Sequence, residues 1–166
     1  MDVFTRTFLP AAAEAGVVAS TVSRHLPIFR RCVESDDATA LVSRCGRPAG
    51  PMHGEFLLLL TYNRMVVTRE TRVLRRLRLH LNTELRYLSN VSWQADSRAA
   101  MIELAATAVD GVRERFRIKM DHPRQVWHLD TLLANVFRSR TPAAWSGTPI
   151  SPIDVHIPIV SAAAVF

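Results

Sequence analysis

The most constraining feature of the chain is a strict two-residue alternation across residues 76–82. Leu77, Leu79 and Leu81 occupy the odd positions, and arginine, histidine or asparagine occupies each even one. In an extended strand successive side chains point to opposite faces, whereas a helix would scatter these leucines around its axis. The segment therefore predicts a half-buried β-strand with a polar face.

Further strands are predicted on both sides of this segment. Apolar runs at residues 55–61 and 65–68 are separated by a short polar stretch, which predicts a hairpin in which Asn63 adopts a positive φ. A second hairpin is expected at Asp110-Gly111, a favoured turn dipeptide, and its second strand alternates in a way that is typical of a half-exposed position. Other short strands are expected at residues 40–42, 85–88 and 91–94.

Helical patterns lie at the two ends of this series of strands. Alanines at residues 11–15 followed by Gly16 predict a helix and its C-terminal stop, and a second helix is expected at residues 20–33. Residues 123–138 place apolar side chains at spacings of three and four, which predicts an amphipathic helix. The proline-bearing residues 139–166 are expected to form an extended tail.

Length and composition fit one main globular domain. The chain has 166 residues, of which 48% are apolar and 22% charged. We expect a helical extension at residues 1–35, a β-domain at residues 36–138 and the tail beyond it. No apolar run is long enough to cross a bilayer, and the start of the chain lacks the features of a secretory signal, so the expected location is cytoplasmic.

Residues 54–68, together with the strand at residues 113–119 and the helix that follows it, resemble a bacterial pleckstrin-homology-like domain. The resemblance covers residues 36–138. It implies a mainly β fold with helices: a partly open barrel of antiparallel strands capped by a C-terminal helix. Domains of this type bind other molecules and rarely catalyse, so the resemblance implies a binding module.

A dense group of arginines provides the first candidate site. Residues 64–86 contain seven arginines and two glutamates, in a chain of net charge +6. Guanidinium groups bind phosphates and carboxylates through paired hydrogen bonds, so we expect a protein partner, an anionic surface or peripheral contact with a membrane. The alternative is a solvated strand face that prevents edge pairing. The members of this group are Arg69, Arg72, Arg75, Arg76 and Arg78.

Residues 11–26 provide a second candidate, because they are similar to the helix-turn-helix of lactose-repressor-type regulators. In that family Ala12 would pack at the helix crossing and Gly16 would make the turn. The resemblance implies that Ser20, Thr21 and Arg24 face the major groove of DNA. The alternative is a pair of helices that pack on the β-domain.

Enzymatic and metal-binding motifs are not indicated by the sequence. It contains no HExxH, P-loop or nucleophile-elbow pattern, and its two cysteines, Cys32 and Cys45, form no CxxC pair. We therefore expect a non-catalytic module without a metal or cofactor. A DNA-binding regulator is the first alternative, and a small enzyme without a recognisable motif is the second.

The tail contains one more pattern. Residues 153–159 alternate isoleucine or valine with aspartate, histidine and proline, and residues 150–160 as a whole are apolar and β-prone. Such a stretch can add as a strand to an exposed sheet edge of its own chain or of a neighbouring subunit. Self-association through residues 150–160 is therefore a further hypothesis.

Overall fold

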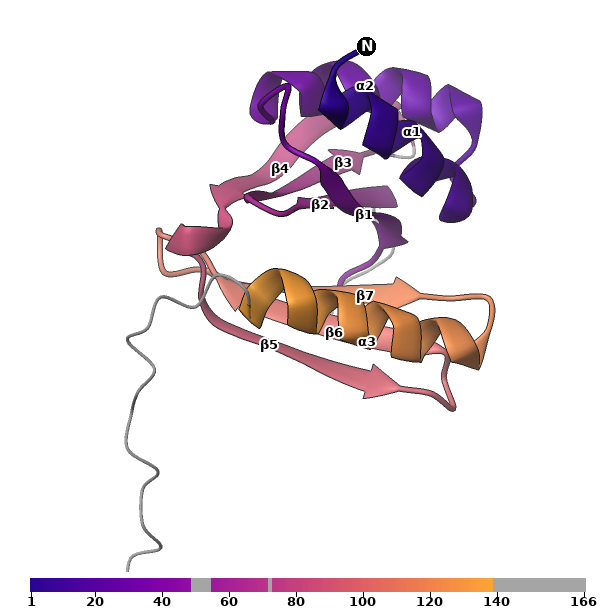
Figure 1. Ribbon diagram of the computed structural model, residues 1–166, viewed down its shortest axis with the longest axis vertical. Coiled ribbons are helices and arrows are strands. Elements are labelled where there is room, and N and C mark those ends of the chain that lie inside the picture. The colour runs from indigo at the N-terminus through magenta and orange to yellow at the C-terminus, as the bar shows by residue number, and fades with distance from the viewer. Residues whose placement is uncertain (49–54, 72, 139–166) are drawn as a thin grey trace, which may run out of the picture.

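The protein is described by a computed structural model that covers residues 1–48, 55–71 and 73–138 of the chain (Figure 1). The described part is mainly β, with two antiparallel sheets and three α-helices, as the sequence predicts. Its elements are α1 (Val3–Glu14), α2 (Ala19–Cys32), β1 (Thr39–Cys45), β2 (Glu55–Thr61), β3 (Arg64–Glu70), β4 (Leu77–Glu84), the 3₁₀ helix η1 (Leu85–Tyr87), β5 (Ser89–Asp96), β6 (Met101–Thr107), β7 (Arg113–Lys119) and α3 (Pro123–Arg138).

The strands form two sheets that are not closed into a barrel. The first sheet has the order β1-β2-β3-β4 and the second the order β5-β6-β7, so neighbours along the chain are neighbours in space. Between the sheets, Gly46 follows β1 and exchanges two backbone hydrogen bonds with Arg117 of β7, at 2.9 and 2.7 Å. Figure 1 shows the two sheets as separate layers, with α1 and α2 on one side and α3 beside the second sheet.

Strand β2 is buried on both of its faces. Residues 56–61 are all buried, which explains why the sequence shows an unbroken apolar run there and no alternation. Alternate side chains nevertheless enter different cores: Phe56, Leu58 and Leu60 point to one, and Leu57 and Leu59 to the other. The first sheet is thus the middle layer of the molecule.

The N-terminal helices cover the outer face of this sheet. Phe4 and Phe8 of α1 and Phe29 of α2 are fully buried and pack with Leu57 and Leu59. Gly16 between the helices has a φ of +64°, a left-handed conformation that favours glycine and reverses the chain after α1. Residues 1–35 therefore share a hydrophobic core with the β-sheet.

The inner core lies between the two sheets and is closed by α3. Val126, Leu129, Leu133 and Val136 occupy one face of the helix and are buried with apolar side chains of both sheets. The bounds of α3 agree with those predicted from its periodicity. The prediction that β7 is half exposed is also confirmed, because Glu114, Phe116 and Ile118 are buried while the intervening side chains are exposed or half-buried.

Two local predictions around the strands are wrong. Asn63 is not among the described residues with positive φ, because the Thr61 hydroxyl accepts hydrogen bonds from the backbone N–H groups of Asn63 and Arg64 and forms the turn itself. Residues 85–88 form no strand. Instead the 3₁₀ helix Leu85–Tyr87 connects the two sheets, with Leu85 anchored in the inner core.

The alternation at residues 76–82 is interrupted in the structure. Leu81 pairs with Val67 and Leu79 pairs with Thr68, so His80 is an extra residue in β4. Because of this bulge, side chains two residues apart on either side of it point to opposite faces of the sheet. Leu81 packs against the inner core, whereas Leu79 shares the outer face with Thr68 and is largely exposed.

Among the described residues, no helix has both the length and the apolar composition needed to cross a membrane. The expected tail at residues 139–166, and with it the strand hypothesis for residues 150–160, lies outside the described part of the chain.

We predict that Asp37 fixes the start of β1 against the β2–β3 turn. Its buried carboxylate accepts hydrogen bonds from Thr61 Oγ1 at 2.6 Å and Asn63 Nδ2 at 2.8 Å. Asp37→Ala leaves these donors without their acceptor and should cost about 1–3 kcal/mol in the free energy of unfolding, measured in urea. The adjacent Asp36 is exposed, and Asp36→Ala is the matched control. Equal stability of the two variants would contradict this role.

Candidate functional site

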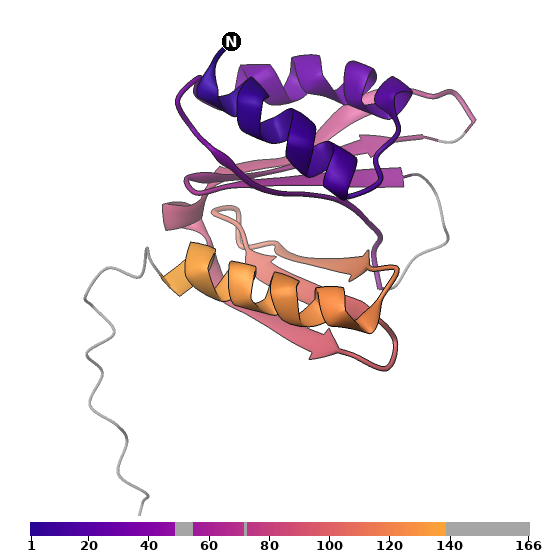
Figure 2. The same ribbon diagram turned by 45° about the vertical axis from the view of Figure 1, so that its right-hand side comes forward.

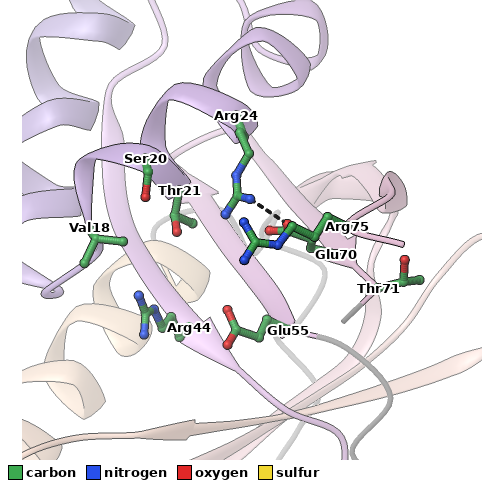
Figure 3. Close-up of a pocket in the computed structure, with 9 residues that line it drawn as sticks. All are labelled: Val18, Ser20, Thr21, Arg24, Arg44, Glu55, Glu70, Thr71 and Arg75. Atoms are coloured by element: carbon green, nitrogen blue, oxygen red, sulfur yellow. Dashed lines mark ion pairs between the residues drawn. The ribbon is translucent and has the colours of Figure 1, made fainter. Parts of the chain in front are cut away.

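A polar cavity of about 350 Å³ lies where the start of α2 approaches the first sheet (Figure 3). Its walls come from three parts of the chain: the start of α2, strands β1 and β2, and the end of β3 with the loop that leads to β4. The residues that line it are Val18, Ser20, Thr21, Arg24, Arg44, Glu55, Glu70, Thr71 and Arg75.

The start of α2 contributes polar groups to this cavity for a local reason. Val18 is the N-cap residue, and its side chain cannot accept a hydrogen bond from the first turn. The Thr21 N–H donates to the Val18 carbonyl at 2.9 Å, which leaves the N–H groups of Ala19 and Ser20 without a partner in the helix, and the end of the helix has a partial positive charge. The hydroxyls of Ser20 and Thr21 lie in the same turn.

The charged side chains of the cavity are unequally paired. Arg24 forms an ion pair with Glu70, with Nη1 2.8 Å from Oε1, and Figure 3 shows Arg75 beside the same carboxylate. Within the described residues, neither Arg44 nor Arg75 forms an ion pair, and neither does Glu55. The cavity therefore holds two guanidinium groups that are available to an anion, with Glu55 as the opposing charge.

Behind the cavity, Glu70 also contacts a buried histidine. His25 Nε2 lies 3.7 Å from Glu70 Oε2, and His25 Nδ1 lies 2.7 Å from Thr68 Oγ1. Burial lowers the pKa of His25 below its ordinary value of 6.5, although the Glu70 carboxylate favours the charged ring. We assign the neutral tautomer in which Nε2–H points to Glu70 and Nδ1 accepts from the Thr68 hydroxyl.

The series Thr68, His25 and Glu70 has the order of a hydroxyl, a base and a carboxylate in a hydrolytic triad. The Thr68 side chain, however, is completely buried, and His25 is only 2% exposed. A nucleophile must reach the substrate, so this hydroxyl is placed to stabilise the contact between α2 and β3. The structure gives these three residues a packing role.

The arginine group predicted from the sequence is divided between several positions. Arg75 turns toward the cavity from the β3–β4 loop, where it has a φ of +44°. Arg69 and Arg78 face each other across β3 and β4 on the opposite side of the sheet, and the Arg69 guanidinium lies 5.7 Å from the centre of the Phe56 ring. Arg76 is exposed in the loop, and Arg72 lies outside the described residues.

The three residues of the proposed recognition helix all line the cavity. Thr21 is buried and Arg24 is held by Glu70, while Ser20 is exposed. The cavity thus brings Ser20, Thr21 and Arg24 together with Arg75, a member of the other predicted group.

Four polar lining residues were not predicted. Arg44 lies on β1, Glu55 begins β2, and Glu70 and Thr71 mark the end of β3. Of these four residues, Glu70 alone has a signal in the sequence, and it is a weak one: Glu70 is one of two acids within the basic stretch of residues 64–86. The positions of the others depend on how the helices dock on the sheet.

A separate charged group lies on the inner side of the sheet. Arg47 Nη2 is 2.6 Å from Glu114 Oε2 and 3.0 Å from His80 Nε2, which joins the segment after β1 to β7 and β4. This arginine is already neutralised by a carboxylate, so it adds to the contact between the sheets. No group of three potential metal ligands occurs within the described ranges.

We predict that His25 makes the fold sensitive to mild acid. Because its pKa is lower in the folded chain, the unfolded chain binds the proton more tightly, and stability falls as the pH drops below 6.5. His25→Gln removes this titration, so the loss in Tm between pH 6.5 and about pH 5 should shrink relative to the unmodified protein. The prediction fails if both proteins lose the same Tm over this range.

Comparison of the chain with protein-family models, with curated proteins and with solved structures finds no match.

Proposed function

We propose that the protein is a non-catalytic binding module that recognises an anionic surface through the pole formed by the start of α2 and the β3–β4 loop. The observation that carries this proposal is that Arg44 and Arg75, which have no ion-pair partner among the described residues, line the same cavity as the first turn of α2. Guanidinium groups and a helix N-terminus both favour a phosphate or carboxylate ligand.

The arrangement of the elements supports the pleckstrin-homology-like interpretation. Four strands are followed by three more, and a C-terminal helix closes the space between the sheets. The fold alone does not define the ligand, so the choice of an anionic surface depends on the side chains at this pole.

The β3–β4 loop adds an apolar tip to the basic pole. Val73 is 93% exposed and Leu74 is 66% exposed, and they are followed directly by Arg75 and Arg76. Adjacent aliphatic and basic side chains match the interface of an anionic bilayer, where the aliphatics enter the headgroup region and the guanidinium groups contact phosphates. A membrane surface is therefore favoured over a free acidic protein.

DNA binding is the alternative, and its geometry is less favourable. A recognition helix presents its N-terminal side chains outward to base edges. Here Thr21 is buried, and Arg24 is engaged by Glu70. DNA is therefore included as one arm of the binding test.

The test measures binding of the purified chain to phosphatidylcholine vesicles, to the same vesicles with phosphatidylserine, and to duplex DNA, each at increasing salt. We expect binding to the phosphatidylserine vesicles, falling with salt. Arg75→Ala/Arg76→Ala should weaken it by at least about tenfold, because each basic residue near an anionic membrane contributes about 1 kcal/mol. Val73→Ser/Leu74→Ser should weaken it as well.

The matched control is Arg98→Ala/Arg138→Ala, which removes the same charge from exposed positions in the second half of the fold. An equal loss in the control would indicate a diffuse effect of net charge and overturn the site. Binding to DNA that is lost with Arg24→Ala, without binding to vesicles, would favour the regulator.

A further inference from the structure

The outer edge of β1 is open over a short stretch. Gly46 directs both of its backbone hydrogen-bonding groups to Arg117, and in a strand these groups alternate sides with a period of two. The N–H and C=O groups of Val42 and Arg44 therefore point away from β2. At the start of the strand, Thr39 N–H donates to Thr7 Oγ1 at 2.9 Å. Among the described residues, the edge is closed at Thr39 and Gly46 and open between them.

This open edge faces a second and larger cavity, of about 650 Å³. Figure 2 shows β1 crossing between α1 and α3, and the cavity is lined by the end of α1, by β1, by the end of β7 and by the first half of α3. Unpaired strand edges are normally covered or blocked by charge, since they pair with other chains. Here the helices leave a groove beside the edge.

The two walls of the groove differ in character. Val42 packs in the outer core with α1, so the α1 wall lies on the face to which the Val42 side chain points, and Ala11 and Ala15 provide small apolar side chains there. The α1 wall also includes Glu14, and the α3 wall carries Arg124, Gln125 and His128 together with Leu129 and Leu132. A strand that fills the groove therefore needs an aliphatic face toward α1 and, toward α3, polar side chains that can meet Arg124, Gln125 and His128.

We propose that residues 153–159 of the same chain bind in this groove as an added strand antiparallel to β1. If Ile153, Val155, Ile157 and Ile159 direct their backbone groups to β1, their side chains share the face of Val42 and meet the α1 wall. Asp154 and His156 then face the α3 wall, which carries Arg124, Gln125 and His128. Pro158 lacks an N–H group, and in this register its nitrogen faces away from β1, the position that an edge strand tolerates.

The connection from α3 is long enough. Fourteen residues, 139–152, separate the end of α3 from this segment. Fully extended they reach roughly 46 Å, at about 3.3 Å per residue. Helix α3 has 16 residues and is roughly 24 Å long, at 1.5 Å per residue. The segment can therefore return along the whole of α3 to the groove.

The test compares two proline substitutions at neighbouring positions of the full-length chain. Val155→Pro removes an N–H group that faces β1, whereas His156→Pro removes one that faces away and is the matched control. Amide exchange is measured by NMR at Val42 and Arg44. We expect slow exchange in the unmodified protein and in His156→Pro, and exchange at least about tenfold faster in Val155→Pro. Amides in the centre of β2 and β3 should stay protected in all three, which verifies the fold.

Equal exchange at Val42 and Arg44 in both variants and the unmodified protein would overturn the proposal. Sedimentation equilibrium identifies the source of the strand. The mass of a monomer, together with the expected exchange pattern, supports the same-chain strand. A dimer with that pattern would mean that the segment pairs between copies, and would overturn the same-chain form. Vesicle binding is measured separately, so failure of one proposal does not affect the other.

Discussion

The burial of β2 on both faces is the constraint on which the rest of the structure depends. A strand with one apolar face needs one covering layer, but the consecutive apolar side chains of residues 56–60 require two. The second sheet and α3 provide one layer, and α1 and α2 provide the other. Removing the N-terminal helices would expose Leu57, Leu59 and Val66 to water, so residues 1–35 are integral to the β-domain.

This double coverage also determines where polar groups can lie. Thr68 is on the central strand β3 and points to the outer face, so it must find a partner beneath α2, and His25 provides it. Glu70, two residues further along the same face, lies at the margin of the helix and meets Arg24 and His25. The cavity begins where this covered face ends, because the first turn of α2 stops short of Arg44 and Glu55. The site is thus the open margin of a helix packed on a sheet.

Much of the fold could be predicted from the sequence, because its signals are local. The three-residue and four-residue spacing of α3 and the two-residue alternation of β7 each reflect one face in contact with one core. The 3₁₀ helix after β4 could not be separated from a strand, since Leu85 is the one buried residue in a turn of three. The bulge at His80 gave no local signal either. It is compatible with the alternating sequence because Leu79 can be exposed while the His80 ring packs between Phe56 and Phe116.

The candidate site was less predictable, because proximity in sequence did not mean proximity in space. The dense arginines at residues 69–78 suggested one patch, but strand alternation sends Arg69 and Arg78 to the inner side of the sheet. Among the described arginines of this stretch, Arg75, with its left-handed backbone, is the one that turns its guanidinium to the α2 side. Its companion there is Arg44, an isolated residue in an otherwise uncharged strand, which has no sequence signal of its own. The basic character of the pole therefore arises from the docking of α2 and the turn of one loop, and these are properties of the tertiary structure.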